Sequence, residues 1–279
     1  MLKQKPISRN LWAWVPSLYV AEGIPYIMTM TVSVILYKRL GISNTEIALY
    51  TSWLYLPWVI KPLWSPFVDL FKTKRYWILL MQLMIGASLA CVAFFIPASR
   101  FFQYTLAFFW LMAFSSATHD TAADGFYMLG LPEHLQAAFV GVRTTFYRIA
   151  TIATQGGLVV FAGFLEKKSD GMSTAWSITL FLTAAVFIAL FLYHFFILPF
   201  PTEDRPAVRI SSKTLGREFL DVFGLFFRKK GILAILSFFL FYRLGETQLL
   251  KIIPLFLLDP RSKGGMELTT SEVGIIYGT

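Results

Sequence analysis

The sequence predicts an all-α polytopic membrane protein, and three observations carry this prediction. First, 56% of the 279 residues are hydrophobic and only 15% are charged, so the chain is far more apolar than a soluble domain. Second, its apolar runs are long enough to cross a hydrocarbon core of about 30 Å as helices. Third, charged and turn-forming residues gather between those runs. A soluble two-domain protein is therefore excluded.

Seven apolar segments are expected to span the membrane. They are residues 12–36, 47–64, 77–96, 101–122, 137–164, 175–198 and 232–258. The first is too long for a cleaved signal sequence and lacks a small-residue cleavage site, so we expect it to stay in the protein. A further apolar run begins at residue 271 and stops before it could span, and we expect the chain to be truncated there.

Basic residues predict the orientation of the spans. With a cytoplasmic N-terminus, the cytoplasmic segments hold 13 Lys or Arg and the outer segments hold seven, as the positive-inside rule requires. The net charge of +9 is therefore assigned to helix orientation, and no nucleic-acid partner is expected. Because the single Cys91 lies inside an apolar run, neither a disulfide nor a thiolate metal site is expected within the chain.

Three regions are expected from the spacing of the spans. Residues 1–200 would form an N-terminal six-helix bundle, residues 201–230 a cytoplasmic loop, and residues 231–279 the first part of a C-terminal bundle. This layout is typical of transporters built from two six-helix halves. Within the loop, apolar residues at helical spacing predict an amphipathic helix on the membrane surface: Leu215, Phe219, Val222, Phe223 and Phe226.

Glu22 in the first span is a candidate for proton coupling. It shares one helix face with Tyr26, Thr29 and Ser33, which predicts a polar stripe through the membrane, and Pro25 predicts a local break in that helix. An intramembrane acid must be paired, protonated or hydrated. We therefore expect Glu22 to face a cavity, with a purely structural hydrogen bond as the alternative.

The fourth span ends in three further candidates, His119, Asp120 and Asp124. Imidazole and carboxyl groups at such close spacing can exchange protons. Alternatively, the two acids pair with Arg or Lys of other spans near the cytoplasmic face. A third interpretation is an intramembrane transferase in which Asp120 and Asp124 hold Mg²⁺, although the second acidic motif that such enzymes need is not found in the sequence.

Basic and polar residues of the fifth and seventh spans are candidates for substrate binding. Arg148 shares a helix face with Thr144, Thr151 and Gln155, and Tyr147 lies beside it. An intramembrane guanidinium needs a carboxylate or an anionic ligand, and Asp120 or Glu22 could supply the carboxylate. In the seventh span, Arg243 and Glu246 either contact substrate or neutralise each other. Tyr26 completes the predicted substrate-binding set.

The segment after the second span predicts a gate. Asp69 closes a short loop followed by Lys74 and Arg75, and Lys61 precedes it. An Asp in such a loop can cap a helix N-terminus and bind Lys or Arg when the inner side is closed. No catalytic signature, cofactor motif or metal site is recognised, so we expect a transporter and not an enzyme.

Five motifs resemble the peptide, acetyl-CoA and drug transporter branch of the major facilitator superfamily, which includes the AmpG-type muropeptide permeases. They are Lys61-x-Leu63-Trp64-Ser65-Pro66-x-x-Asp69, Ser116-Ala117-Thr118-His119-Asp120-x-x-x-Asp124, Tyr147-Arg148 with Gly156-Gly157, Leu244-Gly245-Glu246, and Glu272-Val273-Gly274. The sequence departs from the permease pattern at Glu22, His119 and Glu246. Coupling residues and substrate are therefore expected to differ within the branch.

The resemblance implies alternating access by two six-helix bundles in a bacterial inner membrane, driven by protons. It implies import of anhydromuropeptides, which are glycopeptide-like solutes of peptidoglycan recycling, by a monomer without cofactors. The alternative within the branch is another anionic solute such as acetyl-CoA or a drug. Besides this solute, protons and the lipid bilayer are the only expected partners.

Overall fold

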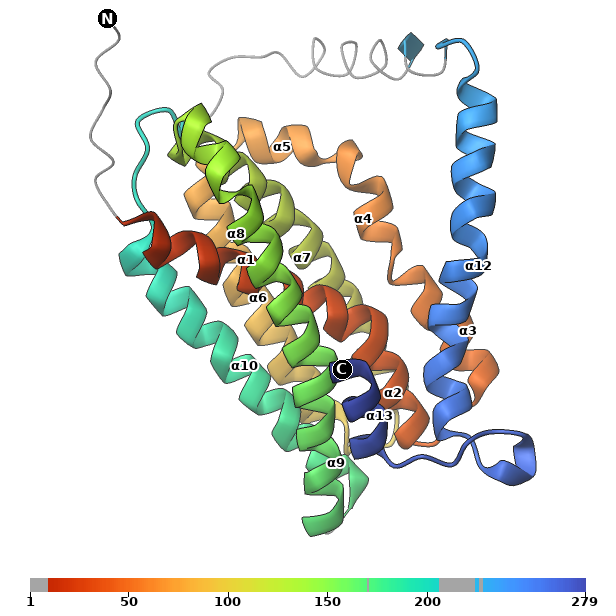
Figure 1. Ribbon diagram of the computed structural model, residues 1–279. Coiled ribbons are helices and arrows are strands. Elements are labelled where there is room, and N and C mark those ends of the chain that lie inside the picture. The colour runs from red at the N-terminus through yellow and green to blue at the C-terminus, as the bar shows by residue number, and fades with distance from the viewer. Residues whose placement is uncertain (1–9, 170, 206–223, 226–227) are drawn as a thin grey trace, which may run out of the picture.

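The computed structural model describes residues 10–169, 171–205, 224–225 and 228–279, and every regular element in that part of the chain is a helix (Figure 1). The amphipathic helix expected around residues 215–226 lies almost entirely outside the described residues. The elements are α1 (Leu11–Ile27), η1 (Met28–Val32), α2 (Ser33–Arg39), α3 (Asn44–Trp53), α4 (Leu56–Ile60), η2 (Lys61–Leu63), α5 (Ser65–Leu70), α6 (Lys74–Phe95), α7 (Phe101–Gly130), α8 (Glu133–Ile152), η3 (Ala153–Leu158), α9 (Val159–Lys168), α10 (Met172–Ile197), α12 (Ile232–Leu258), η4 (Arg261–Lys263) and α13 (Thr270–Gly278).

Four helical stretches are long and apolar enough to cross a membrane: Leu11–Arg39, Lys74–Phe95, Glu133–Lys168 and Met172–Ile197. They confirm the first, third, fifth and sixth predicted spans as helices. Helices α7 and α12 contain 30 and 27 residues and cover the fourth and seventh predicted spans. The described part of the chain is thus a polytopic all-α membrane protein.

The second predicted span is wrong as one continuous helix. Residues 47–64 are divided among α3, α4 and η2, and α5 follows. Pro57, Pro62 and Pro66 each lie in the first turn of one of the three short segments. Proline lacks the N–H that would continue a preceding helix and clashes with its carbonyl groups, so each one begins a new segment.

The break expected at Pro25 takes the form of a π-helical segment, η1, between α1 and α2. Here Thr29 Oγ donates to the Pro25 carbonyl at 2.8 Å and Ser33 Oγ to the Thr29 carbonyl at 2.6 Å. Both residues are fully buried. This part of the predicted polar stripe is therefore packed inside the protein.

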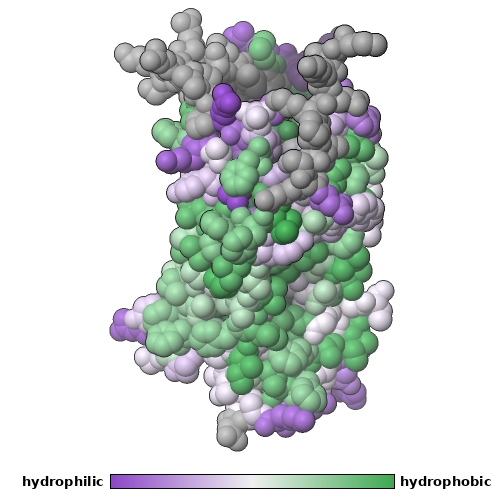
Figure 2. All heavy atoms as spheres, turned by 90° about the vertical axis from the view of Figure 1, so that its left-hand side faces the viewer, coloured by the Kyte–Doolittle hydropathy of each residue, from purple (hydrophilic) through white to green (hydrophobic). Residues whose placement is uncertain are grey.

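The helices form an upright bundle in which α6 packs against α7 and α10, and α1 packs against α7 and α8 (Figure 1). We call the end that holds Leu11 and the start of α12 the N-terminal side, and the end that holds residues 40–43 and 259–269 the far side. Figure 2 shows an apolar belt between two polar ends, as expected of a protein surrounded by lipid.

Two apolar cores fill the bundle, one toward each side. The core on the N-terminal side contains Trp14, Ile78 and Phe126, and the far-side core contains Ile85 and Phe109 with many others. Polar residues lie between the two cores along α7 and, at Gln82, along α6, and Glu22 of α1 lies close to the junction of the two cores. A polar layer at mid-bundle therefore lies between two apolar layers.

Helix α13 lies against η3 and α9 at very short range. A Cβ atom added to Gly274 would lie 2.6 Å from the backbone nitrogen of Val160, and one added to Gly156 would lie 2.5 Å from Gly278 Cα. Gln155 Nε2 also donates to the Tyr277 carbonyl at 3.1 Å. Small residues let these two helices touch through their backbones, as is usual between membrane helices.

Candidate functional site

The mid-bundle polar layer contains an ion pair between Lys61 and Asp120, with Nζ 2.5 Å from Oδ2. Lys61 reaches this position because η2 ends the broken second span beside α7. Glu22 from α1 lies close enough to Asp120 for the two carboxyl groups to interact electrostatically, and Glu22 Oε2 is buried with no hydrogen-bond partner among the described residues. Two neighbouring carboxyl groups repel each other when both are ionised, so their proximity favours a state in which one of them holds a proton.

Asp124 forms the second ion pair of the layer, with Arg143 Nη2 2.6 Å from Oδ1. The Tyr19 hydroxyl donates to the same oxygen at 3.1 Å. The guanidinium lies over the rings of Tyr19 and Tyr127, at 4.5 and 5.2 Å from their centroids, which adds cation–π attraction. The Asp120 side chain is 16% exposed and that of Asp124 is 40%, so Asp120 is the better shielded acid.

We call Glu22, Lys61, Asp120, Asp124 and Arg143 the charged cluster. Three carboxyl groups face two cations, and each carboxyl interacts electrostatically with the others. With every group ionised the cluster carries one excess negative charge, and one bound proton makes it neutral. In a low-dielectric environment the neutral state is favoured. The cluster can therefore take up and release a single proton.

Aromatic side chains surround the charged cluster. Tyr147 lies near Tyr26, Glu22, Asp120 and Tyr55. The Tyr26 ring packs edge-on against Trp58 at 5.2 Å. Together these rings provide faces on which a sugar ring could stack.

A second polar group, which the sequence analysis missed, joins four helices inside the bundle. Gln82 Nε2 lies 3.0 Å from His119 Nε2 and 2.8 Å from His194 Nδ1, and His194 Nε2 lies 2.9 Å from Ser17 Oγ. Gln82 and both histidines are fully buried, and His119 Nδ1 has no hydrogen-bond partner among the described residues. The sequence feature that could have revealed this network is the polar Gln82 inside the apolar run 77–96.

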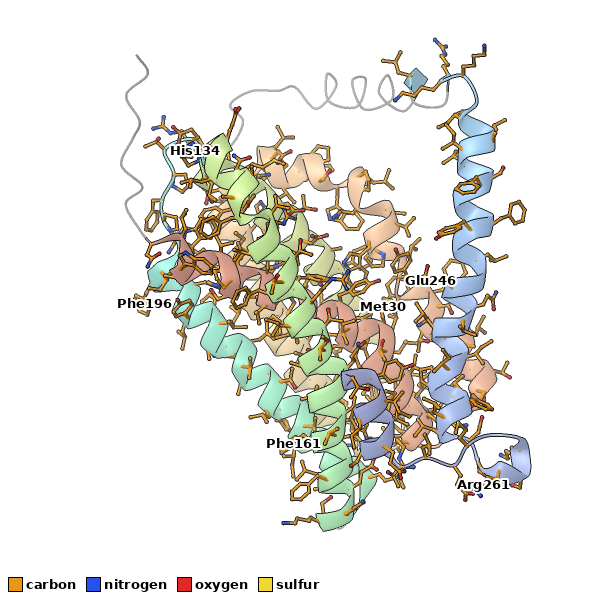
Figure 3. All side chains as sticks on the ribbon, viewed as in Figure 1. Met30, His134, Phe161, Phe196, Glu246 and Arg261 are labelled. Atoms are coloured by element: carbon orange, nitrogen blue, oxygen red, sulfur yellow. The ribbon has the colours of Figure 1, made fainter. Side chains whose placement is uncertain are left out.

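Among the predicted substrate-binding residues, Arg148 is exposed and makes no hydrogen bond or ion pair within the described part of the chain. Asp120, one of the two possible partners considered for Arg148, forms its ion pair with Lys61 instead. Gln155, two turns along the same face, contacts α13. Figure 3 shows Glu246 midway along α12, whereas the side chain of Arg243 lies outside the described residues.

The predicted gate residues lie on the N-terminal side, except Lys61. Asp69 forms an ion pair with Lys74 at the start of α6. The backbone N–H groups of Lys74 and Arg75 are bound by Asp204, at 2.6 and 3.0 Å. Asp204 thus stabilises the N-terminus of α6, a role that the sequence analysis had considered for Asp69.

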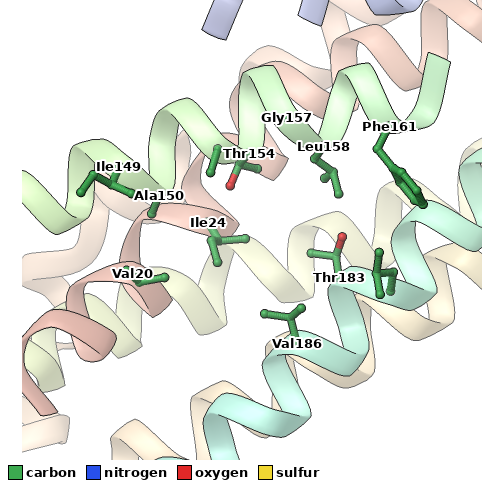
Figure 4. Close-up of a pocket in the computed structure, with 12 residues that line it drawn as sticks. Val20, Ile24, Ile149, Ala150, Thr154, Gly157, Leu158, Phe161, Thr183 and Val186 are labelled. Atoms are coloured by element: carbon green, nitrogen blue, oxygen red, sulfur yellow. The ribbon is translucent and has the colours of Figure 1, made fainter. Parts of the chain in front are cut away.

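A pocket of about 340 Å³ lies between α1, α8, η3 and α10 (Figure 4). Its lining is almost entirely apolar, with Thr154 and Thr183 as its polar side chains. It does not include any residue of the charged cluster, and its chemistry suits a hydrocarbon chain better than a polar solute. Within the described residues, no group of three or more His, Cys, Asp and Glu side chains is placed to hold a metal.

Comparison with known proteins identifies related sequences. A family model described as Major Facilitator Superfamily matches residues 17–278. A Rickettsia conorii protein named "Putative transporter AmpG 4" is 21% identical over 92% of this chain and 62% of its own length. Uncharacterised proteins of Haemophilus influenzae and Schizosaccharomyces pombe are 25% and 28% identical over 69% and 54% of this chain. The chain spans 62%, 44% and 31% of the lengths of these three relatives.

Proposed function

The chain belongs to the Major Facilitator Superfamily, a family of membrane transporters, and we propose that it works as a proton-coupled secondary transporter that imports anhydromuropeptides. The single observation that carries the proton coupling is the charge balance of the charged cluster, in which three carboxyl groups face two cations at mid-bundle. Buried ionisable groups in membrane helices commonly form proton relays.

The proposed coupling acts through Asp120. When Glu22 and Asp120 share a proton, the cluster is neutral and its ion pairs are complete. Loss of that proton leaves a second negative charge beside Lys61, which an approaching cation or a helix movement can compensate. Asp124, which binds Arg143 and Tyr19, is a further proton site. His119 contributes by fixing the position of α7, and with it the position of Asp120.

The proposed solute contacts are Arg148, Tyr147 and Tyr26, together with Gln155, Glu246 and Arg243. Arg148 has no counter-ion among the described residues and would attract a carboxylate of the solute. The rings of Tyr26, Tyr147 and Trp58 would stack on its sugars. Anhydromuropeptides carry both sugar rings and carboxylates, and the name of the Rickettsia relative points to the same class of transporter.

The second candidate is a transporter of another anionic solute, such as acetyl-CoA or a drug. The exposed Arg148 supports this second candidate as much as it supports anhydromuropeptide import, because a guanidinium binds phosphate as well as carboxylate. The intramembrane transferase is disfavoured, because Asp120 and Asp124 bind separate cations and both pairs would have to break before a metal could bind.

We further propose a monomer in a bacterial inner membrane, with the N-terminus in the cytoplasm and the three regions 1–200, 201–230 and 231–279 as its plan. In that orientation, Asp69, Lys74 and Arg75 lie at the cytoplasmic gate. Lys61 connects the gate segment to the charged cluster, because it binds Asp120.

The test is uptake of labelled anhydromuropeptide by the full-length protein in liposomes, with and without an inward proton gradient. Gradient-driven accumulation that unlabelled acetyl-CoA does not reduce supports the proposal, and competition by acetyl-CoA supports the second candidate. Asp120→Asn should abolish accumulation, while Glu133→Gln, which removes an exposed carboxylate at the start of α8, should not. Normal accumulation in the Asp120 variant would refute the coupling role.

A further inference from the structure

The apolar pocket between α1, α8, η3 and α10 is open to the surface of the bundle (Figure 4). Three of its lining residues, Ile149, Leu182 and Val186, are 48%, 49% and 42% exposed. A Cβ atom added to Gly157, which also lines it, would meet nothing within 4 Å. The pocket therefore has space beside η3 that no side chain of the described residues fills.

The depth and the chemistry of the pocket restrict what can occupy it. Its residues lie near the middle of the two membrane-spanning stretches Glu133–Lys168 and Met172–Ile197. Water is a poor occupant, because it needs two to four polar partners and the Thr183 hydroxyl already donates to the Thr179 carbonyl at 2.9 Å. An empty space of about 340 Å³ would lose the packing contacts of its lining. At mid-membrane, acyl chains are the apolar groups that surround the protein.

A line of side chains leads from the pocket to the far side. Phe161 lines the pocket, and Phe164 and Lys168 follow it at the three- and seven-residue spacing of one helix face. Lys168 Nζ lies 4.6 Å from the centroid of the Phe164 ring. Lys168 is exposed and forms no hydrogen bond or ion pair within the described part of the chain, whereas its neighbour Lys167 lies near the Glu272 carboxylate. The apolar line thus ends at a cation without a counter-ion.

The length of this line matches one leaflet of a bilayer. From Gly157 to Lys168 the chain advances by about 16 Å at the rise of an α-helix. Half of a hydrocarbon core of about 30 Å is about 15 Å. A lipid with its phosphate at Lys168 can therefore reach Gly157 with the end of an acyl chain. A lysine at the membrane surface attracts anionic headgroups and binds phosphate as a point charge.

We propose that the pocket holds one acyl chain of an anionic phospholipid from the far-side leaflet, with the lipid phosphate bound by Lys168. Val20 and Ile24 of α1 line the pocket, whereas Glu22, midway between them, lies on the opposite face of that helix. The acyl chain packs behind the helix that carries Glu22 and does not enter the charged cluster. This inference rests on the membrane location of the chain, and on neither the proposed solute nor the proposed proton coupling.

Photolabelling of the full-length protein in phosphatidylcholine vesicles tests the site. The probe is a small fraction of phosphatidylglycerol with a diazirine near the end of one acyl chain, and labelled peptides are identified by mass spectrometry after digestion. We expect the label to concentrate in residues 149–161 and 182–186. The same diazirine chain on phosphatidylcholine should label these residues about fivefold less, the scale of one lysine near a membrane surface. Label spread evenly over the exposed residues of α6 and α10 would overturn the proposal.

Two matched pairs of variants separate the pocket from the headgroup contact. Gly157→Leu fills the pocket and should lower its labelling severalfold. Gly141→Leu adds the same side chain at another exposed glycine of the same stretch, which also meets nothing within 4 Å and does not line the pocket, and it should label like the parent. Equal labelling of these two variants would overturn the acyl-chain site.

Lys168→Ala should lower labelling by the phosphatidylglycerol probe to the level of the phosphatidylcholine probe. Lys263→Ala removes another exposed far-side lysine and should leave labelling unchanged. Equal labelling of these two variants would overturn the bound phosphate. Because every readout is a labelled peptide, a failure to find proton-coupled uptake would leave these outcomes, and the lipid site, unaffected.

Discussion

Lys61 Nζ lies 2.5 Å from Asp120 Oδ2 and so ties the broken second span to α7 at mid-bundle. The pair is only partly exposed, at 29% and 16% of its side-chain surfaces, so neither charge is fully hydrated when the other is removed. Variants that remove one or both of these charges can therefore separate the contribution of Asp120 to stability from its contribution to proton coupling.

Asp120→Asn should lower the free energy of unfolding by about 1.5–3 kcal/mol, because Lys61 loses a charged hydrogen-bond partner. Adding Lys61→Met removes the other charge as well and should restore most of that loss. Gradient-driven uptake should stay abolished in both variants. Thermal unfolding followed by tryptophan fluorescence and uptake by liposomes measure the two effects, and recovery of uptake in the double variant would contradict a proton role for Asp120.

The acids of the charged cluster could be predicted from the sequence, and their partners could not. Glu22, Asp120 and Asp124 are acids inside apolar runs, where acids are rare. Burying an ionisable side chain in a membrane costs free energy, so such residues are candidates for function. Whether Asp120 meets Lys61 or Arg148 depends on how α7 faces its neighbours, and helical spacing within one span does not contain that information. Likewise, nothing in the sequence singles out Arg143 of α8 as the partner that Asp124 has in the structure.

Long-range polar contacts were hardest to predict. Gln82 and His194 are 112 residues apart, and Asp204 reaches the start of α6 from beyond the end of α10. By contrast, the break in the second span was readable in principle, because Pro57, Pro62 and Pro66 lie within ten residues of one another. The prediction gave more weight to the hydropathy of residues 47–64 than to these prolines, and it therefore expected one continuous span.

Two adjacent glycines of η3 provide a matched test of the α13 contact. A Cβ atom at Gly156 would lie 2.5 Å from Gly278 Cα, whereas one at Gly157 meets nothing within 4 Å. Gly156→Ala should therefore lower the free energy of unfolding by about 1–3 kcal/mol through overpacking, and Gly157→Ala should leave it unchanged or raise it slightly. Equal melting temperatures for the two variants would show that α13 does not pack here.

Gln82 should be needed for both stability and uptake, because its side-chain amide serves His119 and His194 at once. Gln82→Leu leaves two buried imidazoles without that partner, and each unsatisfied group costs about 1–3 kcal/mol. Ser88→Ala, one and a half turns further along α6, removes only a bond to the Met84 carbonyl of the same helix and should cost much less. His119 directly precedes Asp120 on α7, so a displaced His119 should also weaken gradient-driven uptake in Gln82→Leu after correction for folded protein. If Gln82→Leu melts like Ser88→Ala, the network does not hold α1, α6, α7 and α10 together, and other contacts, such as the ion pair with Lys61, must then fix the position of Asp120.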